Sequence, residues 1–203
     1  MQIEKVDFPN VGFLKCKVDD LDLLPLNNEI SEIYSDFSKG DSFATGLAGH
    51  LKQQYRLYKS KEHLQNLILP TVYKFKETFP NHDYRGETYK LENSWVNFQH
   101  KWEFNPPHFH LGEFSFALWV RIPYDIEEER KVFPEIKKEE NLVGSFSFQY
   151  IDTLGLIQRY RIECSKEHEN TLLVFPAKMF HFVSPFYTTD EYRITVSGNF
   201  SAC

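Results

Sequence analysis

The feature that most limits the fold of this chain is a pair of histidines that follows two prolines. Pro106 and Pro107 cannot donate hydrogen bonds to a sheet, so the chain is predicted to pass here as an edge strand or a loop. His108 and His110 lie one residue apart, and on an extended chain such residues point to the same side. Residues 114–122, FSFALWVRI, are apolar on both faces, which predicts a strand buried within a barrel.

A third histidine, His181, comes late in the sequence, and a strand-like segment follows it. Arg193 begins this segment, and Thr195 lies on the same face of the extended chain. Because histidine is the commonest metal-binding side chain, the three histidines predict a metal site if the fold brings them together. The planar guanidinium of Arg193 can bind a carboxylate through two hydrogen bonds, so we expect an acidic co-substrate beside the metal.

These motifs resemble those of the Fe(II)/2-oxoglutarate-dependent oxygenases, over about residues 95–200. More narrowly, they are similar to a branch found among marine phages and bacteria, whose Pro-His-x-His motif is followed by a Ser-x-x-x-aromatic strand, here Ser115 and Trp119. The matching residues are the first-motif pair His108 and His110, the distal metal histidine His181, and Arg193 with Thr195 at the Arg-x-Ser/Thr that binds the far carboxylate of 2-oxoglutarate in the family.

The resemblance implies an enzyme that uses Fe(II) and 2-oxoglutarate as cofactors and releases succinate and carbon dioxide. Hydroxylation is the implied reaction, and the cofactors carry its chemistry while the protein supplies their positions. The substrate could be a protein side chain or a small molecule. A nucleobase is disfavoured because the chain carries a net charge of −6 and a nucleic-acid binder needs a basic surface.

The chain departs from the family at one ligand, because the usual first motif is His-x-Asp or His-x-Glu and His110 holds the place of the acid. Iron of this class is commonly held by two histidines and a carboxylate. A bulge at Gly112 could swing Glu113 inward and restore that set, or Glu113 could accept a hydrogen bond from a ligand histidine. The two-residue period of a strand favours the three histidines, because Glu113 is out of phase with His108 and His110. Charge favours Glu113, because its carboxylate would restore the negative charge of the usual ligand set. We predict the three-histidine site and keep Glu113 as the alternate ligand.

Two other functions fit parts of this pattern. A cupin-type metalloprotein, such as an isomerase or a dioxygenase that does not use 2-oxoglutarate, also combines a His-x-His pair with a nearby glutamate and a late histidine. Arg193 argues against it, since a cupin has no use for an arginine at that spacing. The other alternative is a non-catalytic jelly-roll binding module, in which the histidines bind structural zinc or nothing.

The predicted fold is mainly β, of the α+β class. About seven or eight short strands follow Trp95 and fit a double-stranded β-helix, or jelly roll, with N-terminal helices packed on one sheet. Residues 94–203 form the predicted catalytic core, and residues 1–93 form a strand and helical extension that is integral to the fold. A jelly roll brings residues from distant strands to one open end, so His181 can meet the first two histidines.

The N-terminal part combines several predicted elements. Residues 1–16 could supply an early strand. Pro25 is expected to end one short element, and a brief helix is expected over residues 28–37. Residues 44–79 are interpreted as helical, and apolar side chains repeat at helical spacing at Leu64, Leu67, Ile68, Val72 and Phe75.

Two further segments bear on the site. Residues 94–104 are predicted to form a strand with Trp95, Asn97 and Gln99 on one face, and Asn97 or Gln99 could point into a ligand cavity. Residues 126–140 carry mixed charges and predict an exposed loop or short helix, with a mobile lid as the alternative.

Composition narrows the class of protein. With 203 residues, the chain is long enough for one sizeable core and short for two. Its three cysteines form no CxxC pair, which favours reduced thiols over a disulfide framework. The sequence lacks a signal-peptide pattern and an apolar run of about eighteen residues, so we expect a cytoplasmic protein, or one of the host cytoplasm if the chain is phage-encoded.

Overall fold

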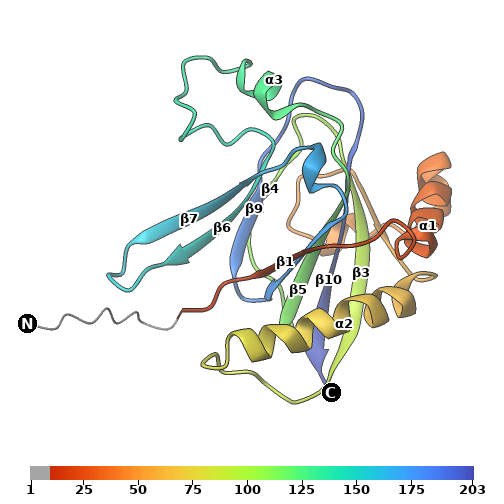
Figure 1. The fold of residues 1–203 in the computed structure, drawn as a ribbon. Helices are drawn as coiled ribbons and strands as arrows, with labels where there is room; N and C mark the ends of the chain where they lie inside the picture. Colours follow the sequence, from red (N-terminus) through yellow and green to blue (C-terminus); the bar gives the residue numbers. More distant parts are fainter. Residues whose placement is uncertain (1–9) are drawn as a thin grey trace, which may run out of the picture.

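The computed structural model describes residues 10–203, which form ten β-strands and three α-helices (Figure 1). The strands are β1 (Leu14–Lys17), β2 (Gln53–Arg56), β3 (Tyr89–Gln99), β4 (Asn105–His108), β5 (Phe114–Arg121), β6 (Ser145–Ile151), β7 (Ile157–Glu163), β8 (Thr171–Pro176), β9 (Phe180–Val183) and β10 (Arg193–Ala202). The helices are α1 (Leu24–Ser35), α2 (Lys61–Thr78) and α3 (Ile126–Arg130).

The strands form two antiparallel sheets. One has six strands in the order β1-β8-β5-β10-β3-β2, and the other has four in the order β4-β9-β6-β7. The prediction of a mainly β protein with few helices is confirmed. Strand β4 lies at an edge, as its two prolines require, and the apolar strand β5 lies in the middle of the larger sheet.

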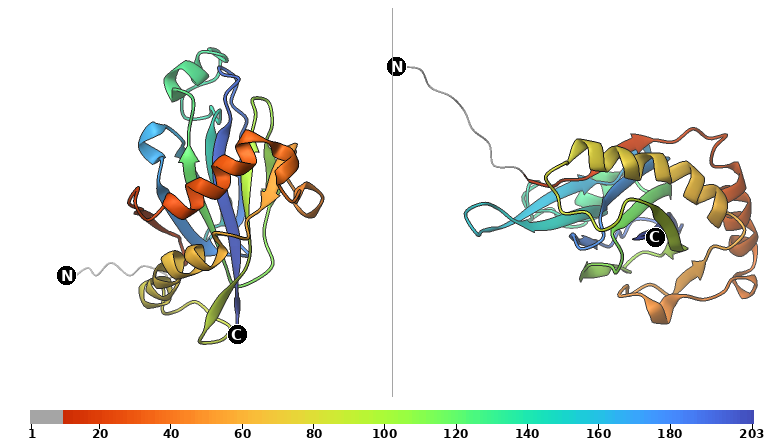
Figure 2. Two further views of the ribbon diagram at one scale, coloured as in Figure 1. Left: turned by 90° about the vertical axis from the view of Figure 1, so that its right-hand side faces the viewer. Right: turned by 90° about the horizontal axis from the view of Figure 1, so that it is seen from below.

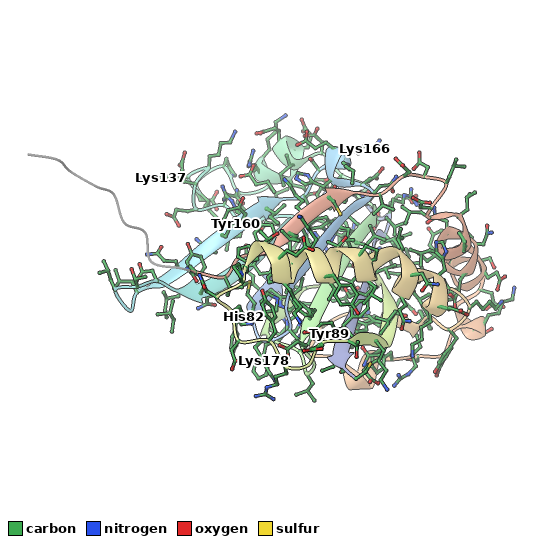
Figure 3. All side chains as sticks on the ribbon, turned by 60° about the horizontal axis from the view of Figure 1, so that its bottom comes forward. His82, Tyr89, Lys137, Tyr160, Lys166 and Lys178 are labelled. Atoms are coloured by element: carbon green, nitrogen blue, oxygen red, sulfur yellow. The ribbon has the colours of Figure 1, made fainter. Side chains whose placement is uncertain are left out.

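The six-stranded sheet is covered on both faces. Helices α1 and α2 lie on one face (Figure 2), where Val96, Phe98 and Val196 pack with helix residues such as Ile68 and Val72. Figure 3 shows Tyr89 of β3 beside α2, where its ring packs near those of Tyr73 and Phe114. The opposite face packs against the four-stranded sheet through an aromatic cluster that includes Trp119, Phe146, Phe148 and Phe175.

Helix α1 corrects the prediction for Pro25. This proline lies in the first turn of the helix, and it therefore does not end an element. A proline is tolerated there because the first N–H groups of a helix have no intrahelical acceptor. The helix predicted over residues 28–37 accordingly begins earlier, at Leu24, and ends at Ser35.

The helical prediction for residues 44–79 is half wrong. Helix α2 is present, and Leu64, Ile68, Val72 and Phe75 are buried as expected. The segment before it forms strand β2, which pairs with β3. Pairing with the open edge of β3 satisfies the backbone groups of β2, and both its faces are covered, so the segment lacks the strict alternation that would reveal a strand.

Two strands from the N-terminal part of the described chain, β1 and β2, belong to the larger sheet. Strand β1 overlaps the end of the strand predicted in residues 1–16 and pairs with β8; the rest of that prediction falls partly on residues 1–9, outside the described residues. Strand β3 runs from Tyr89 to Gln99 and spans the predicted boundary after residue 93, so the strand predicted over residues 94–104 begins and ends earlier. In residues 10–203, no helix is both long and apolar enough to cross a membrane.

Two buried glutamates fix the connections between elements. Glu29 of α1 accepts hydrogen bonds from the backbone N–H of Tyr58, Lys59 and Ser60, directly before α2 begins. Glu129 of α3 accepts from the backbone N–H of Tyr187 and Thr188, in the connection between β9 and β10. The charged insertion therefore begins as a short helix that is tied to the core.

Candidate active site

A cavity lies between the two sheets. Its walls come from β2, β3, β5, β8 and β10 of the larger sheet, from β4, β6 and β9 of the smaller sheet, and from residues 47–51. The three predicted histidines, Asn97, Arg193 and Thr195 all line it. The fold therefore brings together all the predicted site residues except Glu113.

The three histidines form one cluster. His108 ends β4 and lies directly opposite His181 of β9 in the strand register, and His110 follows two residues after His108. The ring centroids of His108 and His181 are 4.3 Å apart, and one nitrogen from each of the three rings lies within 4.8 Å of the others. Three imidazoles at this separation can bind one metal ion.

Backbone carbonyls orient two of the three rings. The Nδ1 atom of His108 lies 2.7 Å from the carbonyl oxygen of Pro106, and that of His181 lies 3.0 Å from the carbonyl of Met179. A carbonyl only accepts, so each Nδ1 carries the proton and each Nε2 keeps its lone pair. This is how metal-binding histidines are usually held.

Burial keeps the three imidazoles uncharged. It lowers the pKa of His108, and it lowers the pKa of His110 to about 4, with His108 adding to the shift. The pKa of His181 is lowered well below its ordinary value, first by burial and then by the two neighbouring histidines. At neutral pH the cluster can therefore accept a metal ion without first losing protons.

Arg193 also lines the cavity and is 1% exposed. Its guanidinium donates to Oε1 of Gln99, to the hydroxyl of Tyr124 at 2.8 Å, and to the carbonyl oxygens of Gly144 and Ser184 at 3.2 and 3.5 Å. All these acceptors are neutral, and no acidic side chain in the described part of the chain forms an ion pair with Arg193. A buried cation without a counter-charge is costly, so the site is suited to an anionic ligand.

Thr195 and Asn97 lie next to Arg193 on the cavity face. Thr195 follows Arg193 by two residues on β10, and Asn97 lies opposite it on β3, with 3.3 Å between Nδ2 of Asn97 and Oγ1 of Thr195. The prediction that Trp95, Asn97 and Gln99 share one face of a strand is confirmed, since all three line the cavity.

Glu113 is not brought to the histidines. Its carboxylate accepts a hydrogen bond from the backbone N–H of Arg85 at 3.0 Å, and it is not part of the metal-binding cluster. Gly112 has a positive φ of 105°, so the chain turns there, and β5 begins directly after Glu113. A turn at Gly112 does not carry the carboxylate inward, and the structure does not support Glu113 as the alternate ligand.

Two residues of the cavity region escaped the sequence analysis. Gln54 was assigned to a helix, and only recognition of β2 as a strand could have placed it opposite Asn97. Tyr124 lies after the end of β5, where the sequence shows only Pro123 as a stop signal. Its contact with Arg193 depends on the packing of distant segments.

Comparison with known proteins identifies the family. A model of the 2OG-Fe(II) oxygenases matches residues 93–199, which covers the histidine cluster and the Arg193 strand. The chain belongs to this family. It is therefore an oxygenase that depends on Fe(II) and 2-oxoglutarate, and the cupin and binding-module alternatives are set aside. No curated protein matches the chain.

Solved structures of similar fold include other members of the oxygenase class. A Pseudomonas putida prolyl-4-hydroxylase is 10% identical over 93% of this chain and 91% of its own, with a TM-score of 0.55. A collagen prolyl hydroxylase of Paramecium Bursaria Chlorella virus-1, solved with 2-oxoglutarate, is 12% identical over 94% and 96% of the two chains, with a TM-score of 0.53. A non-heme alpha-ketoglutarate-dependent epimerase from nogalamycin biosynthesis is 12% identical over 95% and 77%, with a TM-score of 0.57.

Proposed function

We propose that this oxygenase is a hydroxylase with a double-stranded β-helix core, in which His108, His110 and His181 bind Fe(II) and Arg193 with Thr195 binds the far carboxylate of 2-oxoglutarate. The observation that carries the proposal is the buried, uncompensated guanidinium of Arg193 in the same cavity as three neutral imidazoles. The three imidazoles of the cavity fit a cation, and the guanidinium fits an anion.

The side chains position the cofactors. When bound by these residues, iron and 2-oxoglutarate would supply the oxidising chemistry, in which dioxygen converts 2-oxoglutarate to succinate and carbon dioxide and one oxygen atom goes to the substrate. Carbonyl contacts hold His108 and His181 with Nε2 free. Arg193 would pair with the far carboxylate of 2-oxoglutarate, and the longest of its present contacts are those to the carbonyls of Ser184 and Gly144. Thr195 donates its hydroxyl proton to the same carboxylate.

The cavity favours an uncharged reacting group. Apart from Arg193 and the three histidines, its walls are made of apolar, amide and hydroxyl side chains and of backbone. With Arg193 paired to 2-oxoglutarate, no other ionised side chain lines the cavity to pair with a charged substrate group. Both a peptide and a small metabolite can present such a group, and the similar structures include a collagen hydroxylase and an epimerase of nogalamycin biosynthesis.

The test measures 2-oxoglutarate binding without turnover. Titration calorimetry under anaerobic conditions, with Mn(II) in place of Fe(II), gives separate affinities for the metal and for 2-oxoglutarate. Replacing Arg193 by Ala should weaken 2-oxoglutarate binding by about a hundredfold, because a buried bidentate charge pair is lost. Metal affinity should stay within about threefold, since the guanidinium does not touch the histidines.

The matched control is Arg121→Ala. Arg121 lies at the end of β5 with its side chain partly exposed, and it pairs with Glu191 at 2.8 Å. Its loss should leave both affinities unchanged, because exposed ion pairs contribute little. An equal loss of metal and 2-oxoglutarate binding in the Arg193 variant would contradict the proposed role.

A further inference from the structure

Three polar side chains form a row across the cavity face of the larger sheet. Gln54 of β2 lies opposite Asn97 of β3, which lies opposite Thr195 of β10. Nε2 of Gln54 donates to Oδ1 of Asn97 at 2.8 Å, and Nδ2 of Asn97 donates to Oγ1 of Thr195 at 3.3 Å. Gln54 and Asn97 are 1% and 5% exposed, and Oε1 of Gln54 has no partner among the described residues.

The direction of the hydrogen bonds in this row matters because the Thr195 hydroxyl has only one proton to donate. If Thr195 donates that proton to Asn97, it cannot donate it to a carboxylate in the cavity. When Asn97 turns its NH2 group toward Thr195, the hydroxyl only accepts from Asn97 and its proton is free for a ligand. The oxygen of Asn97 then faces Gln54, which must supply an N–H.

We propose that Gln54 and Asn97 are positioning residues that fix the direction of these hydrogen bonds and so hold the Thr195 hydroxyl as a donor to 2-oxoglutarate. The inference rests on the proposed function, in which Thr195 contacts the far carboxylate. It adds two residues that act only through Thr195. Oε1 of Gln54 is left at the cavity wall as the free acceptor of the row.

Replacing Gln54 by Glu tests whether Gln54 fixes the direction of these hydrogen bonds. A carboxylate cannot donate, so the NH2 group of Asn97 must turn toward Glu, and the oxygen of Asn97 then takes the Thr195 proton. The affinity for 2-oxoglutarate, measured by anaerobic titration with Mn(II), should fall about tenfold, the loss expected when a hydrogen bond to a charged group is removed. Thr195→Val should cause a similar loss.

The double variant separates this effect from simple charge repulsion. In a Thr195→Val background no hydroxyl remains to be turned, so Gln54→Glu should cause no further loss of affinity. Direct repulsion between the new carboxylate and 2-oxoglutarate would persist in that background. Gln53→Glu places the same charge one residue away, on the other face of β2, and should leave the affinity unchanged.

The outcomes are distinct. Wild-type affinity in Gln54→Glu, or an undiminished loss in the double variant, would overturn the positioning role while leaving Thr195 as a 2-oxoglutarate ligand. Wild-type affinity in Thr195→Val would contradict both that ligand role and the positioning role of Gln54 and Asn97. If Gln54→Glu does not fold, as judged by thermal unfolding, Asn97→Asp makes the same test. Its carboxylate must accept the Thr195 proton, and its effect should also vanish in the Thr195→Val background.

Discussion

The two faces of the six-stranded sheet are both buried, yet they differ in how their polar groups are satisfied. On β10, Ile194 and Val196 pack against the helices, whereas the alternating residues Arg193 and Thr195 line the cavity. The helix face is closed by apolar contacts. The cavity face contains the guanidinium of Arg193, which forms no ion pair with an acidic side chain of the described residues. Successive residues of one strand therefore serve stability and ligand binding in turn.

Buried polar groups sharpen this contrast. On the helix side, Glu29 is 5% exposed, and its carboxylate receives four hydrogen bonds from Tyr58, Lys59 and Ser60. On the cavity side, Gln54 is equally buried and one of its polar atoms has no partner in the described part of the chain. Burial alone therefore does not distinguish the two sides; the hydrogen bonds made by Glu29 and Gln54 do.

The largest expected effect is on the cavity side. Replacing His181 by Ala removes one of three proposed ligands, so iron affinity should fall by on the order of a hundredfold or more, and succinate production should be lost. The unfolding free energy of the metal-free protein should change by only about 1 kcal/mol, as one hydrogen bond to a carbonyl is removed. Metal analysis and urea denaturation provide the measurements.

The control for that experiment lies on the helix side. His63 of α2 contacts the carbonyl of Asp22 and belongs to no metal-binding cluster among residues 10–203. Its replacement by Ala should leave iron content unchanged. Retention of iron by the His181 variant would contradict the proposal that His181 binds iron, and the two faces would no longer differ in metal binding.

The next effect is a loss of stability without a loss of binding. Phe98 is fully buried on the helix face, where its ring packs near those of Tyr34, Phe37 and Tyr55. Phe98→Ala should lower the unfolding free energy by about 3–5 kcal/mol, because a large cavity is left in the core. The folded variant should bind 2-oxoglutarate within about twofold of wild type, and a loss comparable with that of an Arg193 variant would show that the two faces are coupled.

A smaller effect should depend on pH. Burial alone raises the pKa of Glu29, but hydrogen bonds from Ser60, Tyr58 and Lys59 bring it below its ordinary value of 4.5. Its stabilisation is therefore complete above that value and is lost as the pH falls through the lower folded-state pKa. Glu29→Gln should cost about 1.5–3 kcal/mol at pH 7. In urea denaturation the difference from wild type should shrink in acid, and a difference that stays constant with pH would contradict an ionised Glu29.

The smallest effect distinguishes the two predicted metal sites. Glu113→Ala removes an acceptor from the backbone N–H of Arg85 and should lower stability by about 1 kcal/mol. Iron affinity should not change, because the carboxylate lies outside the histidine cluster. Loss of iron on the scale expected for His181 would restore Glu113 as a ligand.

Much of the site was predictable from local sequence. The Pro-His-x-His segment, the later histidine and the Arg-x-Thr strand each carry their own chemistry, and the period-two alternation of a strand fixes which of their side chains share a face. The same alternation placed Trp95, Asn97 and Gln99 on one face of a strand, and all three line the cavity. Helix α2 was also predictable, because its buried stripe repeats at helical spacing.

Tertiary structure decided the rest. The sequence by itself determined which side chains can bind a metal and a carboxylate, because residue type and strand period are local properties. Whether His181 lies opposite His108, whether Glu113 turns inward, and that Gln54 completes a row with Asn97 depend on the pairing of strands far apart in the chain. Such pairing is set by which edges remain open and which faces can be buried together, and no short stretch of sequence contains that information.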